Sequence, residues 1–88
     1  MFAAAEAMAV LRETAVAYES LPDWNAEALK SALESIGAAH DLKLGKAQAP
    51  IRVAVSGRTV GPPLFEALEV LGRAETLRRL HNAEAALD

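Results

Sequence analysis

Residues 24–39 read WNAEALKSALESIGAA, and this stretch carries the clearest helix signals in the chain. Asn25 is a favoured N-cap residue, and Glu27 would lie in the first turn, where the helix dipole stabilises a carboxylate. Trp24 before the cap and Leu29 at the fourth helical position have the spacing of a hydrophobic staple. We therefore predict a helix that ends near residue 39 and has a buried stripe of Leu29, Leu33 and Ile36.

Helical spacing recurs on both sides of this stretch. Alanine is abundant and β-branched residues are few, which favours helix. A first helix is predicted over about residues 3–20. A fourth is predicted to open at Pro62 and Pro63 and to end at Gly72, with a fifth helix following as far as Leu87. The residues expected to face the core are Met8, Leu11, Ala15, Tyr18, Leu64, Leu68, Leu71, Leu77, Leu80 and Leu87.

The segment between the second and the fourth predicted helix allows three interpretations. Leu44, Ala47, Ile51 and Val55 have helical spacing, but Pro50 lies among them. A helix that starts near Leu44 would be kinked by the proline, whereas one that starts near Ala49 would hold the proline in its first turn. A short strand over residues 53–55 is a third possibility, although it would have no partner strand. In both helical interpretations the helix ends at Gly57.

The expected fold class is all-α, a compact bundle of five short helices in a single domain over residues 1–88. The chain has 52% hydrophobic and 24% charged residues, which argues against disorder. It has no cysteine, which excludes disulfides and thiolate metal sites. No apolar run approaches the length of a membrane helix, and Glu6 interrupts the apolar start. We therefore expect no membrane contact and a cytoplasmic protein.

Charge is distributed unevenly along the chain. The net charge is -3, which excludes a generally polybasic nucleic-acid binder. Residues 41–60 nevertheless hold Lys43, Lys46, Arg52 and Arg58 against the single acid Asp41, so this part is basic. Two interpretations remain open: a solvated surface with chance clustering, or a local surface that faces an anion.

The residues offer no recognisable catalytic constellation. His40 and His81 have no second ligand at metal-binding spacing, so we expect His40 to compensate a helix end and His81 to be solvated. The serines lack a nucleophile motif, and the glycines at 57 and 61 are not followed by the Lys-Ser/Thr of a phosphate loop. We predict no catalytic residue and no metal site within this chain.

Residues 42–80 carry a resemblance to a known family. They closely resemble the C-terminal end of bacterial-type glutamyl-tRNA synthetases, which are class I aminoacyl-tRNA synthetases. That family ends with a Lys-Leu-Gly-Lys segment, a Pro-Leu-Arg-x-Ala-Leu-Thr-Gly segment, a Pro-x-Leu-Phe-Glu segment and Leu-Arg-Arg-Leu. The matching residues here are Lys43–Lys46, Pro50–Arg52, Ala54, Ser56, Gly57, Pro62, Leu64–Glu66, Leu71, Gly72 and Leu77–Leu80.

The resemblance implies a helical anticodon-binding domain at the C-terminal end of a larger glutamate–tRNA ligase. The catalytic domain, with its His-x-Gly-His and Lys-Leu-Ser-Lys motifs, would lie upstream and would use ATP and Mg²⁺; no cofactor is expected in this chain. The implied partners are the anticodon loop of the glutamate tRNA and the upstream domains, and we expect a monomer. By position, the implied RNA-binding residues are Arg52, Arg58, Thr59, Gly61, Pro62 and Leu64, with Lys43 and Lys46 on phosphates.

The chemistry of these residues suits a single-stranded loop. Unpaired bases are read by stacking and by hydrogen bonds to their edges, and an arginine guanidinium offers both a plane and a rigid fork of donors. Arg52 has an alternative role, a structural ion pair with Asp41 or Glu66. Four further side chains are expected to be structural or solvated: Trp24 and Phe65 in the core, and Arg78 and Arg79 in solvent. The alternative function is a small helical protein-interaction domain with no nucleic-acid role.

Overall fold

The computed structural model describes residues 4–57 and 61–87, and these form five helices with no strand among them. The all-α prediction is therefore confirmed. The helices are α1 (Ala4–Glu19), α2 (Ala26–Ala39), α3 (Leu44–Ser56), α4 (Leu64–Leu71) and α5 (Arg73–Leu87).

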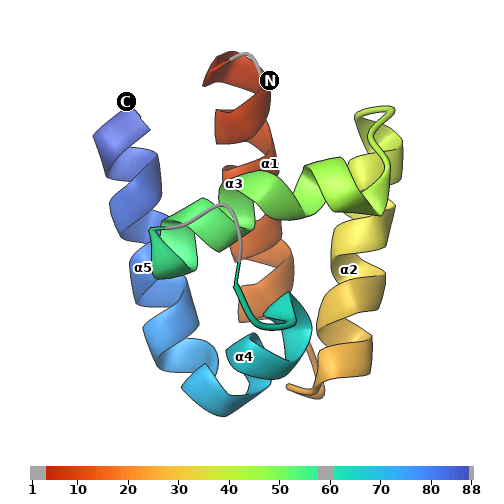
Figure 1. Ribbon diagram of the computed structural model, residues 1–88, viewed down its shortest axis with the longest axis vertical. Helices are drawn as coiled ribbons and strands as arrows, with labels where there is room; N and C mark the ends of the chain where they lie inside the picture. The colour runs from red at the N-terminus through yellow and green to blue at the C-terminus, as the bar shows by residue number, and fades with distance from the viewer. Residues whose placement is uncertain (1–3, 58–60, 88) are drawn as a thin grey trace.

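The helices pack around α1. Figure 1 shows α1 between α5 and α2, with α3 crossing in front of it and the short α4 closing one end. α3 contacts α1, α2 and α5, while α4 contacts α2 and α5. Figure 1 shows the end of α3 beside α5, although α4 lies between these two helices in the sequence. No helix in the described ranges is long and apolar enough to cross a membrane.

The core is formed by apolar side chains from all five helices, as the helical spacing predicted. Met8, Ile36, Leu71 and Leu77 are only half-buried, and the side chain of Leu87 lies outside the described residues. Trp24 and Phe65 belong to the core or pack against it, as expected. The buried hydrophobic residues are Val10, Leu11, Ala15, Tyr18, Leu29, Leu33, Ala47, Ile51, Leu64, Phe65, Leu68 and Leu80.

α2 begins where the sequence predicts. The side chain of Asn25 accepts a hydrogen bond from the backbone N–H of Ala28 at 2.8 Å, which satisfies one of the free donors at the helix start. A second cap comes from another helix, because Glu69 Oε1 of α4 accepts from the N–H of Ala26 at 2.7 Å. The first cap could be read from the sequence, whereas the second depends on the packing of α4 against α2.

Gly37 has a packing reason to be in a helix. A Cβ at this position would lie 3.0 Å from the backbone oxygen of Leu42 and 3.1 Å from the Cβ of Ala47. The residue is buried, and its carbonyl accepts from the Leu42 N–H at 2.8 Å. The glycine, which weakens a helix by itself, thus lets the start of α3 approach α2 closely.

α3 shows which of the three interpretations of the middle segment is correct. The helix starts at Leu44 and contains Pro50, so a start near Ala49 and a short strand over residues 53–55 are both wrong. Proline removes one helical hydrogen bond, but Ala47, Pro50 and Ile51 are all buried, and their packing favours a continuous helix. Gly57 ends the helix with a φ of 73°, as predicted, and its N–H donates to the Val53 carbonyl at 2.8 Å.

The prolines before α4 are placed differently from the prediction. Pro63 is the N-cap residue and the helix starts at Leu64, so neither Pro62 nor Pro63 lies in its first turn. Pro63 has a φ of -51° and a ψ of 125°, an extended conformation that turns the chain into the helix. Because Pro62 precedes the helix, its carbonyl is not used in the helical ladder and accepts from a side chain instead.

Candidate nucleic-acid interface

A pocket of about 310 Å³ lies where α3 ends, α4 begins and α5 passes. This volume is at the small end of the range for ligand pockets, roughly 300–1,000 Å³. Apolar side chains line much of it, and guanidinium groups from two different helices supply its charge. The lining residues are Arg52, Val55, Ser56, Gly61, Pro62, Leu64, Ala67 and Arg79.

Arg52 joins the two chain segments that border the pocket. Its Nη1 donates to the carbonyl of Pro62 at 2.8 Å, and its Nη2 donates to Gln48 Oε1 at 3.3 Å. A Cβ at Gly61 would lie 3.6 Å from Nη1, in ordinary van der Waals contact, so Gly61 lies directly beside the guanidinium. Within residues 4–57 and 61–87, no ion pair joins Arg52 to Asp41 or Glu66, so the structural ion pair is not formed.

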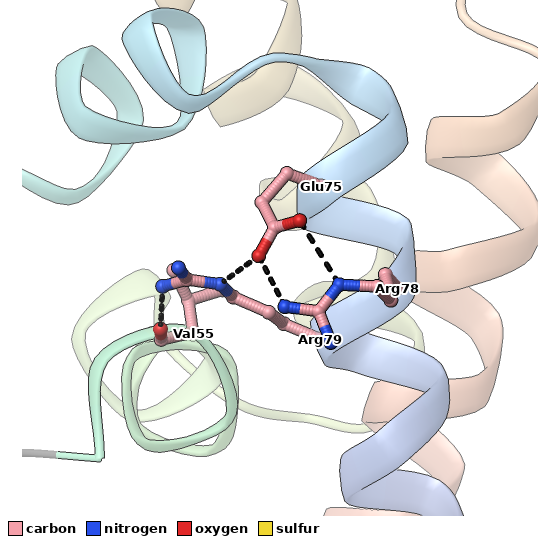
Figure 2. A network of polar contacts seen from close by, with 4 residues as sticks. All are labelled: Val55, Glu75, Arg78 and Arg79. Carbon is pink, nitrogen blue, oxygen red and sulfur yellow. Dashed lines mark hydrogen bonds and ion pairs between the residues drawn. The ribbon is translucent and has the colours of Figure 1, made fainter.

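Arg79 enters the pocket from α5 and is held on two sides. Its Nε donates to Glu75 Oε2 at 2.8 Å, and its Nη1 donates to the carbonyl of Val55 at 2.7 Å (Figure 2). The Val55 carbonyl lies in the last turn of α3, where carbonyls lack a helical partner and carry the negative end of the helix dipole. Arg79 therefore caps α3 from outside. Its side chain is part-buried, so the prediction that Arg79 is solvated is wrong.

Glu75 is shared by two arginines. Arg78 donates from Nε to Glu75 Oε1 at 2.9 Å and from Nη2 to Oε2 at 2.5 Å, so Oε2 accepts from both Arg78 and Arg79 (Figure 2). Hydrogen bonds from Arg78 and Arg79 lower the pKa of the Glu75 carboxyl to about 2. The same contact raises the pKa of Arg78. Arg78 itself is 60% exposed, as expected for a solvated residue, and is not among the pocket's lining residues.

The implied RNA-binding residues fall into three groups in the structure. Arg52, Gly61, Pro62 and Leu64 line the pocket together. Lys43 and Lys46 are exposed at the start of α3 and lie outside the pocket; Lys43 is the N-cap residue and makes no side-chain cap bond. Lys43 and Arg52 are nine positions apart, which is about 14 Å along the helix axis. Arg58 and Thr59 lie outside the described residues.

Four lining residues were not identified from the sequence as part of a site: Val55, Ser56, Ala67 and Arg79. Val55 and Ser56 follow Arg52 by three and four residues, so helical spacing alone places them on its face. Ser56 Oγ donates to the Arg52 carbonyl at 2.7 Å. No local signal identifies Arg79, because its position in the pocket depends on how α5 packs against α3.

The two histidines are placed as expected. His40 is the C-cap residue of α2, and its Nε2 lies 2.8 Å from Glu13 Oε2. His81 is exposed on α5, with Nδ1 3.2 Å from Glu84 Oε2. Among the residues that the structure describes, no three His, Cys, Asp or Glu side chains are grouped to hold a metal ion.

Comparison with known proteins supports the resemblance noted from the sequence. A family described as "Anticodon binding domain" matches residues 2–84. The glutamate–tRNA ligase of Salinispora arenicola is 65% identical over 71 residues, which cover 81% of this chain and 15% of that protein. The glutamate–tRNA ligase of Thermobifida fusca is 66% identical over 61 residues, or 69% of this chain and 13% of that protein.

The glutamate–tRNA ligase of Streptomyces coelicolor is 64% identical over 66 residues, or 74% of this chain and 13% of that protein. The chain thus spans about one seventh of the length of these relatives, and it matches their C-terminal part. Since the family match covers nearly every residue, the chain belongs to the anticodon-binding-domain family.

Proposed function

We propose that this chain is the anticodon-binding domain of a glutamate–tRNA ligase and that its pocket receives a nucleotide of the anticodon loop. The observation that carries the proposal is the placement of Arg52. Its guanidinium lies at the edge of a small, partly apolar pocket and is fixed by the Pro62 carbonyl. A guanidinium held in one orientation loses little freedom when it stacks on a base or donates to a base edge.

The rest of the pocket fits this role. Leu64 supplies an apolar wall, and the exposed residues Gly61 and Pro62 lie at the rim. No carboxylate is among the lining residues, so the pocket does not repel an acceptor-rich ligand. Lys43 and Lys46, exposed farther along α3, would meet phosphates of the same strand. Arg58 and Thr59 keep the RNA-binding role that the resemblance implies.

The proposal extends to the longer ligase. The domain would occupy residues 1–88, and the upstream domains would hold ATP and Mg²⁺ and attach glutamate; no residue of this chain is assigned to those ligands. The partners would be the glutamate tRNA and the upstream domains, in a cytoplasmic, monomeric enzyme.

The alternative, a protein-interaction domain, receives no support from the comparisons. The large hydrophobic residues exposed in the described ranges are single valines on three different helices: Val16, Val53 and Val70. Isolated apolar residues of this kind are ordinary on protein surfaces.

The test is a titration of the ¹⁵N-labelled chain with the anticodon stem-loop of a glutamate tRNA, beside a loop whose middle anticodon base is changed. We expect amide shifts at Arg52, Gly61 and Leu64 that shrink with the altered loop. Arg52→Gln should weaken binding of the cognate loop about tenfold, because a charged hydrogen bond to the base is lost.

Lys46→Gln is the matched control, since it also removes one charge but lies outside the pocket. It should weaken both loops alike and lower the salt dependence of binding. Equal affinity of the unaltered chain for the two loops, or no shifts at high RNA concentration, would refute the proposal.

A further inference from the structure

Arg79 has donor capacity that the fold does not use. Its Nε is bonded to Glu75 and its Nη1 to the Val55 carbonyl. Within residues 4–57 and 61–87, its Nη2 makes no hydrogen bond to the protein. Because an arginine carries five N–H donors in a rigid plane, two bonds fix the direction of the others. The side chain lines the pocket, so the unused donors are available to a ligand there.

The two arginines of the pocket are anchored in the same way, from two different helices. Arg52 on α3 donates to the Pro62 carbonyl just before α4, and Arg79 on α5 donates to the Val55 carbonyl near the end of α3. Each guanidinium is thus fixed by a backbone carbonyl on another segment. Two fixed cations at one small pocket favour a ligand with several hydrogen-bond acceptors.

Glu75 determines where Arg79 lies. Oε2 of its carboxylate accepts from both Arg79 and Arg78, and Oε1 accepts from Arg78 alone (Figure 2). Glu75 is not among the residues that line the pocket, so it acts on a ligand only through Arg79. The pair of arginines bonded to one carboxylate also provides an internal control, because only Arg79 lines the pocket.

We infer that Arg79 is a second RNA-binding residue of the pocket, donating to a base carbonyl or phosphate oxygen of the nucleotide that Arg52 binds, and that Glu75 is its positioning residue. The inference rests on the proposed function, since it needs RNA in the pocket. It assigns to α5 a direct part in binding that the sequence did not indicate.

The experiment measures binding of the cognate and altered stem-loops to the 88-residue chain by fluorescence anisotropy over a range of salt concentrations. We expect Arg79→Gln to weaken cognate binding about tenfold and Arg78→Gln to change it less than about twofold. Glu75→Gln should weaken binding by less than Arg79→Gln. The double variant Glu75→Gln/Arg79→Gln should bind as Arg79→Gln does, because the carboxylate acts through that arginine.

Two readouts separate a contact with RNA from a purely structural role for Arg79. If Arg79 donates to a phosphate, its loss lowers the slope of log affinity against log salt by about 0.7, the value for one contact on a single strand. If it donates to a base, the preference for the cognate loop falls while the slope is unchanged. Equal weakening for both loops with an unchanged slope would mean that Arg79 only caps α3, and would overturn the inference.

Folding and the proposed function are controlled separately. Thermal unfolding and the amide spectrum establish that each variant is folded, and Arg79→Met, which also removes the charge and the donors but keeps an apolar stem, gives the same readouts if Arg79→Gln unfolds. Failure of the unaltered chain to prefer the cognate loop would refute the proposed function. Normal binding by that chain together with normal binding by Arg79→Gln would refute only this inference.

Discussion

The molecule joins its helices in two contrasting ways. An aromatic cluster formed by Tyr18, Trp24, Leu29 and Leu68 ties α1, α2 and α4 together. The ring centroids of Tyr18 and Trp24 are 5.5 Å apart at 84°, the Tyr18 hydroxyl donates to the Leu29 carbonyl at 3.0 Å, and Trp24 Nε1 donates to the Leu68 carbonyl at 2.9 Å. The arginine pocket ties α3, α4 and α5 through Arg52 and Arg79.

In both regions side-chain donors bond to backbone carbonyls, but the regions differ in how many side-chain donors remain unpaired. In the aromatic cluster each ring has one polar hydrogen, and both hydrogens are consumed inside the fold. In the pocket each guanidinium has more donors than the fold uses, and the site is open. Hydrogen bonds from side chains to backbone carbonyls therefore use every polar hydrogen of the rings in one region, and leave donors for a ligand in the other.

The largest expected effect is on the aromatic cluster. Leu29→Ala should lower the free energy of unfolding by about 3 kcal/mol, because it opens a cavity at a fully buried site. Chemical denaturation measures it, with Val70→Ala at an 89% exposed site as a control that should change stability by less than about 0.5 kcal/mol. RNA affinity of the folded Leu29→Ala protein should stay unchanged; a loss comparable to that of Arg52→Gln would show that the two regions are coupled.

A smaller effect is expected from the hydroxyl of Tyr18. Burial raises the pKa of this phenol, so it stays protonated and donates at neutral pH. Tyr18→Phe removes only the hydrogen bond to Leu29 and should cost about 1 kcal/mol of unfolding free energy. Denaturation curves of the two proteins measure the cost. An unchanged stability would mean that packing of the rings, and not the hydrogen bond, holds α1 to α2.

The smallest effect concerns pH and the pocket. The pKa of Glu75 is lowered from 4.5 to about 2, so the stability that its bonds to Arg78 and Arg79 contribute is fully present above about pH 4.5. That contribution is lost as the pH falls toward 2. We expect the unaltered chain to melt slightly above Glu75→Gln at pH 6, with the difference shrinking toward pH 2. A melting difference that is constant between pH 6 and pH 2 would contradict the ion pairs.

The sequence predicted most of the fold because the helix signals are local. The Asn25 cap, the stop at Gly57 and the apolar stripes depend on residues three or four positions apart. Pro50 was the ambiguous element, since its penalty as a helix interior residue competes with burial that only packing reveals. The buried Thr14 and Thr76 were missed for a related reason, because helical spacing ranks polar residues as surface.

For the candidate site, sequence and tertiary structure contribute different parts. The sequence alone determined which family the chain resembles and which residues of α3 and of the segment before α4 are candidates for RNA binding, because the residues that carry the resemblance lie in one continuous stretch. Tertiary structure decided that Arg52 bonds to Pro62 and that Arg79 joins the same pocket and bonds to Val55, whereas the Glu75–Arg79 pair has the i,i+4 spacing of a local helix contact. The Arg52–Pro62 and Arg79–Val55 hydrogen bonds join residues 10 and 24 positions apart, and no local rule predicts them, since they arise only when packing of the apolar faces brings α3, α4 and α5 together.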